Sequence, residues 1–140
     1  MKTLNPTLIL LLMAVILSSC NTPKPENQAG ENVISEDIRI YYFHNTKRCA
    51  TCHAVEDETK TALTLFYENE MQAGTIEFTS LNLQEEDGEK MAQALQVSGQ
   101  TLLIVKDTDK INLTNEGFMN ARTNPAKFHE ILKSEIDKLL

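Results

Sequence analysis

The sequence lacks tryptophan, and only 6% of its residues are aromatic. Five glycines and four prolines in 140 residues exclude collagen-like and low-complexity classes. Three cysteines are too few for a small scaffold that disulfides hold together. Positive charge is also scarce, because 13 lysines and arginines face 20 aspartates and glutamates, for a net charge of -7. This composition argues against DNA and RNA as partners and favours one ordinary globular domain.

The longest hydrophobic run covers the ten residues from Leu8 to Leu17. A helix that spans a bilayer needs about 20 apolar residues, whereas the hydrophobic part of a signal peptide needs about 7–15. The chain continues to Cys20, and the resulting LSSC resembles the lipobox of bacterial lipoproteins, in which the cysteine becomes the first mature residue and its sulfur is diacylated. We therefore expect residues 1–19 to be a removed signal peptide and Cys20 to carry the lipid. The alternative is a cytosolic or secreted protein in which Cys20 has no such role.

The segment that follows Cys20 is polar and has no sustained hydrophobic period. Residues 21–37 (NTPKPENQAGENVISED) contain two prolines and a glycine, as expected of a flexible tether between an anchor and a domain. We expect residues 20–37 to form the lipidated cysteine and its tether, and the folded domain to cover 38–140. The lipid would hold this domain outside the cytoplasm on a bacterial membrane, facing the periplasm.

The first half of the domain predicts a strand, a helix and a second strand. Residues 38–43 (IRIYYF) are β-branched and aromatic, which indicates a buried strand. From Cys52 apolar residues recur at helical spacing, and acidic residues that include Glu56, Asp57 and Glu58 occupy the other face as a solvated surface. This helix is expected to end near Gly74. Residues 75–83 alternate as a strand whose hydrophobic phase changes near Ser80.

The second half predicts a short helix over 85–96, strands over 101–105 and 110–113, and a final helix that begins at Asn124 and Pro125. Strands separated by a helix pair in parallel, and the short turn between the last two strands makes a hairpin. The expected fold class is therefore α/β, with a mixed four-stranded sheet and three helices that cover both of its faces.

The CATC sequence directly after the first strand is the most informative feature. Two thiols three residues apart in a first helical turn can close a disulfide. Cys49 would lie at the helix N-terminus, where free N–H groups and the helix dipole favour a thiolate. Lys47 and Arg48 are expected to lower its pKa further. Cys49 is thus the expected attacking sulfur and Cys52 the resolving one, and the alternative is a structural disulfide without turnover.

With CxxC after the first strand and this order of elements, residues 38–140 resemble the thioredoxin-like superfamily. More narrowly, YYFH at 41–44 followed by RCATC at 48–52 is similar to small bacterial lipoproteins of the nitrophenyl compound nitroreductase subunit ArsF family. The resemblance implies a thioredoxin-like fold and a role beside a partner subunit that reduces nitroaromatic compounds, including arsenicals. Cys49 and Cys52 match the functional positions. The expected function is thiol–disulfide redox exchange with a partner protein, without a bound cofactor.

Two features depart from the thioredoxin pattern. Thioredoxins place a cis-proline before the third strand, and Gln100 stands there in this chain. A cis bond before a residue other than proline costs about 2.5–4 kcal/mol, so we expect a trans bond at Gln100 and an altered loop opposite the dithiol. The first strand also carries no carboxylate that could relay protons to the resolving thiol. His44, at the end of that strand, is the nearest candidate, and the alternative is a solvent-exposed loop histidine.

Two other classes of function share the same cysteines. CATCH at 49–53 fits the CxxCH pattern of covalent c-type haem, with His53 as one axial ligand and Met71, Met91 or Met119 as the other. A strongly β strand before the motif is unusual for a small cytochrome. The two thiolates with His44 or His53 could instead hold Zn²⁺, Cu(I) or trivalent arsenic in a non-catalytic module. His129 has no companion at ligand spacing and is expected on a helix surface.

Overall fold

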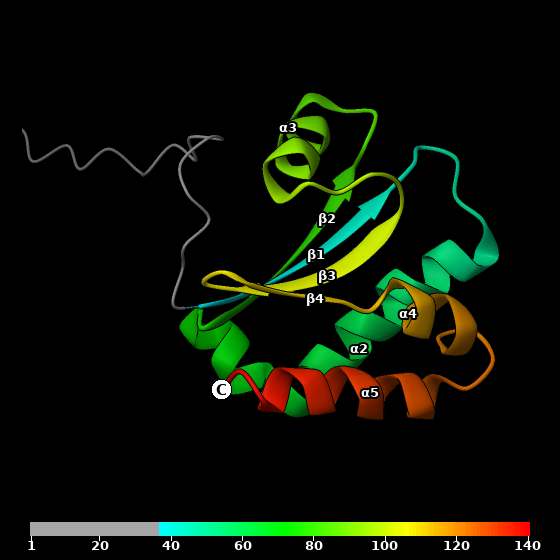
Figure 1. Cartoon of the computed structure of the whole chain (residues 1–140). Helices are drawn as coiled ribbons and strands as arrows, with labels where there is room; N and C mark the ends of the chain where they lie inside the picture. The colour runs from blue at the N-terminus through cyan, green and yellow to red at the C-terminus, as the bar shows by residue number, and fades with distance from the viewer. Residues whose placement is uncertain (1–36) are drawn as a thin grey trace, which may run out of the picture.

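The computed structural model describes residues 37–140, so the expected signal peptide and the lipidated Cys20 lie outside the described residues. Figure 1 shows the chain with its elements labelled. The structure begins its first strand at Ile38, as the sequence predicts. The elements are β1 (Ile38–His44), α2 (Ala50–Ala73), β2 (Ile76–Asn82), α3 (Glu86–Leu95), β3 (Thr101–Lys106), β4 (Asp109–Asn112), α4 (Thr114–Asn120) and α5 (Pro125–Asp137).

The four strands form one mixed sheet in the order β2-β1-β3-β4. β1 and β2 run in parallel, joined through α2, while β1 with β3 and β3 with β4 are antiparallel. This confirms the predicted α/β class, the parallel crossover and the hairpin. A mixed four-stranded sheet flanked by helices is a thioredoxin-like architecture.

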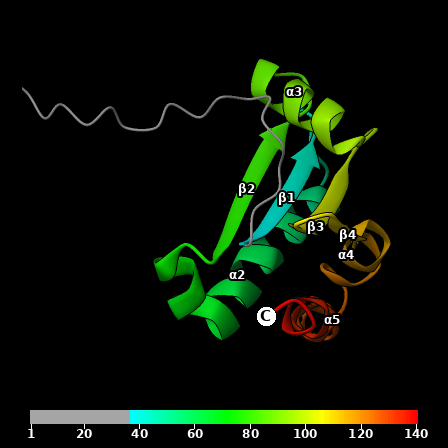
Figure 2. The ribbon, with the colours of Figure 1, turned by 60° about the vertical axis from the view of Figure 1, so that its left-hand side comes forward.

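Helices cover both faces of the sheet, as expected. α3 lies on one face, near the carboxyl ends of β1 and β2, and α2, α4 and α5 lie on the other (Figures 1 and 2). Alternation along β1 explains the two layers, because successive side chains point to opposite faces. Ile40 and Tyr42 belong to the larger core under α2 and α5, whereas Tyr41 and Phe43 belong to the smaller core under α3.

β2 serves both cores in turn. Its pairing with β1 runs without interruption from Ile76 to Asn82. Ile76 and Phe78 contribute to the core under α2 and α5, and Leu81 contributes to the core under α3. The change of hydrophobic phase near Ser80 is therefore a switch of the buried face within a regular strand.

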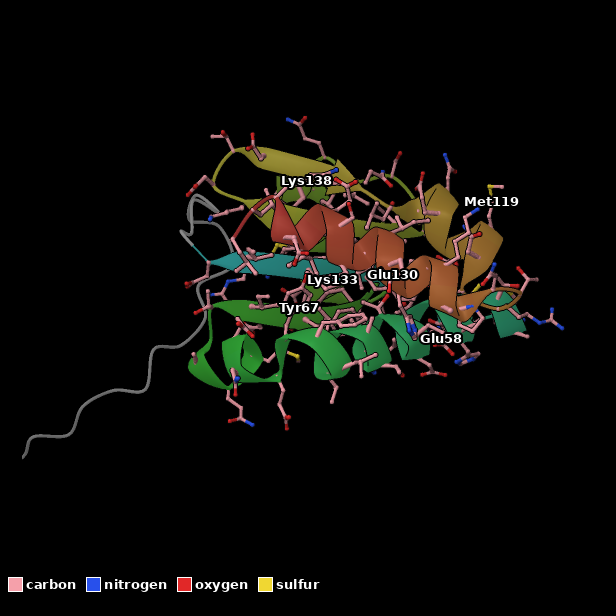
Figure 3. All side chains as sticks on the ribbon, turned by 90° about the horizontal axis from the view of Figure 1, so that it is seen from below. Glu58, Tyr67, Met119, Glu130, Lys133 and Lys138 are labelled. Carbon is pink, nitrogen blue, oxygen red and sulfur yellow. The ribbon has the colours of Figure 1, made fainter. Side chains whose placement is uncertain are left out.

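α2 ends where the sequence predicts, at Gly74, whose φ of +79° is the left-handed conformation that glycine adopts at low cost. α5 lies along α2 (Figure 3), and two side-chain links join the helices. Tyr67 donates from its hydroxyl to the Asp137 carboxylate at 2.6 Å. His129 lies 2.7 Å from the Glu58 carboxylate with only 14% of its side chain exposed. His129 lies on a helix as expected, but its side chain is half-buried against α2 instead of exposed at the surface.

α4 is a fourth helix that the sequence analysis did not predict. It has no side-chain cap at Leu113 and contains Gly117, two features that weaken any helical pattern. Tertiary packing supports it instead. A Cβ atom at Gly117 would lie 3.2 Å from a methyl group of Val55 and 3.5 Å from the Phe128 ring, so the glycine allows α4 to approach α2 closely. α4 therefore packs against the turn of α2 that follows Cys52.

Candidate functional site

The dithiol lies where the chain leaves the carboxyl end of β1 and enters α2. Cys49 is the N-cap residue of α2, with extended backbone angles, and its sulfur accepts a hydrogen bond from the backbone N–H of Cys52 at 3.3 Å. An N-cap side chain replaces one of the missing hydrogen bonds of the first turn. The helix begins at Ala50, so Cys49 lies at its N-terminus and Cys52 lies in its first turn, as the sequence predicts. Helix capping thus fixes the position of the Cys49 sulfur.

The two cysteines differ in exposure although their sulfur atoms are in contact. The sulfurs lie 2.6 Å apart, and both residues are free thiols in the structure. Cys49 is exposed, whereas Cys52 is only 3% exposed. A partner molecule can therefore reach the sulfur of Cys49 but not that of Cys52.

The pKa values of the two thiols shift in opposite directions. The hydrogen bond from the Cys52 thiol, followed by backbone N–H groups of the first helical turn, lowers the pKa of Cys49. Burial, followed by the hydrogen bond with Cys49, raises the pKa of Cys52. The predicted direction at Cys49 is confirmed, but its main causes are these hydrogen bonds instead of the charges of Lys47 and Arg48. The guanidinium of Arg48 is engaged elsewhere.

The backbone carbonyl of Cys52 is the point on which Arg48 and the core tyrosine Tyr42 converge. The Tyr42 hydroxyl donates to this oxygen at 3.0 Å, and Nη2 of Arg48 donates to it at 3.2 Å. The guanidinium also lies over the Tyr42 ring, 5.4 Å from its centroid. Burial and the neighbouring Cys52 raise the pKa of Tyr42 to about 12, so the hydroxyl keeps its proton and acts as a donor at neutral pH.

Glu56 is a buried carboxylate beside the dithiol that the sequence analysis missed. It was expected on the solvated face of α2, yet it is only 8% exposed. Ion pairs at 2.5 Å join it to Arg48 and to Lys60. Burial alone would raise the pKa of Glu56, but hydrogen bonds and charges from these two cations outweigh it and lower the pKa to about 2. The expectation was wrong because it rested on helical periodicity alone. Arg48 lies outside the helix, so periodicity gives no sign that it pairs with Glu56.

His44 and Gln100 lie at the same end of the sheet as the dithiol, where β1 ends and β3 begins. Nδ1 of His44 lies 3.0 Å from the Asn45 carbonyl oxygen, and its ring is 6.0 Å from that of Tyr42. These contacts do not involve a thiol, and the role of His44 in proton transfer stays a prediction. Gln100 precedes Thr101, which pairs with Phe43 at the end of β1. No peptide bond within residues 37–140 is cis, so the expected trans bond at Gln100 is confirmed.

The residues that the haem alternative needs do not fit covalent attachment in this fold. His53 is exposed on the first turn of α2, but the sulfur of Cys52 belongs to a residue that is only 3% exposed and packs inside the domain. A thioether at Cys52 would require this turn to unpack. Of the three candidate methionines, Met119 is 72% exposed on α4 (Figure 3), while Met71 and Met91 pack against the two separate cores.

Residues 37–140 hold no group of three histidine, cysteine, aspartate or glutamate side chains arranged to bind a metal ion. His44 and His53 are therefore not gathered with the dithiol into a three-ligand set in this part of the chain. In the same residues, no helix has the length and apolar character needed to cross a membrane.

Comparisons with known proteins add little to this description. No family model matches the chain, and no curated protein does. Among solved structures, the chain is similar to one titled "Structure of a malarial protein", with 17% sequence identity and a TM-score of 0.39. The match covers 53% of this chain and 74% of that one. A likeness of this degree supports no statement about function.

Proposed function

We propose that this chain is an extracytoplasmic, lipid-anchored thiol–disulfide redox protein in which Cys49 and Cys52 cycle between dithiol and disulfide. The observation that carries the proposal is the asymmetry of the pair. One thiol is exposed, caps a helix and has a lowered pKa, and the other is buried, in contact with the first, and has a raised pKa. This is the division of labour that an attacking and a resolving thiol need.

The exchange balances as a transfer of two electrons. The Cys49 thiolate attacks one sulfur of a partner disulfide, which forms a mixed disulfide and releases the partner's other sulfur as a thiolate that takes up a proton. Cys52 then loses its proton and attacks the Cys49 sulfur, which closes the Cys49–Cys52 disulfide and releases the second partner thiol. The dithiol loses two electrons and two protons, and the partner disulfide gains them. The reverse sequence oxidises a partner dithiol.

The structure supports this order of steps. Cys52 begins with a raised pKa, so it stays protonated while Cys49 is free. Its sulfur already lies 2.6 Å from that of Cys49, so the second attack needs little movement. Effective concentration then favours release of the partner over accumulation of the mixed disulfide.

The narrower parts of the proposal rest on the sequence. LSSC at 17–20 supports lipidation at Cys20 and a location outside the cytoplasm. The similarity of residues 41–44 and 48–52 to the ArsF family supports a redox partner protein, to which the dithiol passes electrons for the reduction of nitroaromatic or arsenical compounds. Membrane fractionation of the full chain tests the anchor, because Cys20→Ala is expected to lose both the acyl groups and membrane attachment, whereas Ser19→Ala keeps them.

The redox role is tested by trapping. The full-length Cys52→Ser variant, treated with oxidised glutathione, is expected to hold a stable mixed disulfide on Cys49, since no thiol remains to resolve it. Trypsin cuts after Arg48 and Lys60, and the peptide between them separates this site from Cys20 in mass spectrometry. The matched Cys49→Ser variant should acquire much less adduct on the buried Cys52. Equal adducts in both variants, or none in either, would contradict the assigned roles.

A further inference from the structure

The carbonyl oxygen of Cys52 receives more hydrogen bonds than its place in a helix requires. In a regular α-helix this oxygen accepts one bond, from the N–H four residues later. Two side chains add to it from outside the helix, the hydroxyl of Tyr42 at 3.0 Å and Nη2 of Arg48 at 3.2 Å. One donor belongs to the central strand β1, and the other belongs to the residue directly before Cys49. The resolving cysteine is thereby attached both to the core and to the start of its own motif.

Arg48 is held in place on three sides. Its guanidinium lies over the ring of Tyr42, bonds the carbonyl of Cys52 and pairs with the carboxylate of Glu56. Only 13% of its side chain is exposed. Its Nε is buried and has no hydrogen-bond partner among residues 37–140, a cost that the other three contacts must outweigh. Lys60 pairs with the same carboxylate from one turn further along α2.

We propose that Tyr42 and Arg48 are positioning residues that clamp Cys52 against Cys49 and so shift the dithiol–disulfide equilibrium towards the disulfide. This inference rests on the proposed redox function, and it names the residues that determine whether the dithiol or the disulfide is favoured. Closing the disulfide joins two sulfurs that must give up conformational freedom, and a dithiol already held with its sulfurs in contact has less freedom to lose. In the disulfide form the covalent bond holds the two sulfurs together, so loss of Tyr42 or Arg48 would change their freedom little. In the dithiol form the same loss would give the sulfurs more freedom.

An electrostatic role for Arg48 makes the opposite prediction. A cation that stabilises the Cys49 thiolate stabilises the reduced form, so its removal would favour the disulfide. The ion pair with Glu56 offsets that charge, whereas the hydrogen bond to the Cys52 carbonyl remains. Tyr42 is uncharged while its hydroxyl keeps its proton. The sign of the change in the two variants therefore separates a clamp from a charge effect.

The test measures the equilibrium between the full-length protein and glutathione at pH 7. One protein dithiol and one oxidised glutathione give one protein disulfide and two reduced glutathiones. Samples are quenched with acid and a thiol label, and mass spectrometry reports the disulfide fraction in the tryptic peptide that holds Cys49 and Cys52. The variants are Tyr42→Phe, which removes only the hydroxyl, and Arg48→Met, which removes the guanidinium.

Two matched controls come from the same molecule. Tyr67→Phe also removes a buried hydroxyl, which donates to the Asp137 carboxylate and the Lys133 carbonyl. Tyr67 lies about 22 Å along α2 from Cys52. Arg39→Met removes an arginine that pairs with Asp37 and Glu77 at the other end of β1. Neither control residue contacts the dithiol, so both variants are expected to leave the equilibrium unchanged. Circular dichroism confirms folding of every variant.

We expect the equilibrium constant for disulfide closure to fall by up to about fivefold in Tyr42→Phe, because the full effect of one neutral hydrogen bond sets the upper limit. In Arg48→Met it should fall about tenfold, which equals about 30 mV in reduction potential. An unchanged or raised constant in either variant, or an equal fall in the controls, would overturn the clamp. A wild-type protein that forms no Cys49–Cys52 disulfide at any glutathione ratio would instead overturn the redox function itself.

Discussion

Replacing Glu56 by glutamine should remove the part of the pH dependence of the free energy of unfolding that arises from this carboxylate. The Glu56 carboxylate is buried and pairs with Arg48 and Lys60, and although burial opposes the change, these cations lower its pKa from 4.5 to about 2. A group whose pKa is lower in the folded state stabilises that state above its unfolded pKa and loses this effect as the pH falls to the folded pKa. The difference between the two pKa values corresponds to about 3 kcal/mol of free energy of unfolding at neutral pH.

Urea denaturation of the wild type and Glu56→Gln at a series of pH values measures this effect. At neutral pH the wild type should be more stable by about 3 kcal/mol. This gap should close between about pH 4.5 and about pH 2, since Glu56 then becomes protonated in both states. Glu86→Gln is the matched control, because Glu86 also pairs with a lysine four residues later but is exposed, and it should change stability little. A gap that stays constant with pH would refute the assigned charge state of Glu56.

Three further outcomes follow from packing and exposure. Gly88→Ala should lower the free energy of unfolding by about 2 kcal/mol or more, because its Cβ would lie 1.9 Å from a backbone oxygen of β2. In thermal or urea melts, Phe128→Ala should cost about 3–5 kcal/mol, whereas Leu65→Ala, at a side chain that is 65% exposed, should cost under about 0.5 kcal/mol. Alkylation at neutral pH should modify Cys49 faster than Cys52, and equal rates would contradict their unequal exposure and pKa values.

The central elements of the fold could be predicted because their signals are local. Residues 38–43 are continuously apolar or aromatic apart from Arg39, as a central strand with two covered faces requires. Gly74 marks the end of α2 by a conformation that glycine favours. The CxxC motif combines a strand end with a helix start, so its position after the carboxyl end of β1 and at the start of α2 was also accessible from the sequence.

The missed features depend on contacts between distant segments. α4 has little helical propensity of its own and forms where Gly117 lets it approach Val55. Glu56 lies in an acidic run beside the exposed Asp57, and only the folded position of Arg48 shows that Glu56 is buried. The Tyr42 hydroxyl reaches the Cys52 carbonyl across ten residues of sequence, and no spacing rule connects a strand residue with that atom.

The most direct test of the central claim is a redox titration of the full-length wild type, made in a host able to attach haem and equilibrated over a series of glutathione ratios. Mass spectrometry of the peptide between Arg48 and Lys60 reports its state, and visible absorbance reports any haem. A colourless protein in which Cys49 and Cys52 pass reversibly from two free thiols to one disulfide is the predicted result. Thiols that stay free at every ratio, or a haem attached through both cysteines, would contradict it.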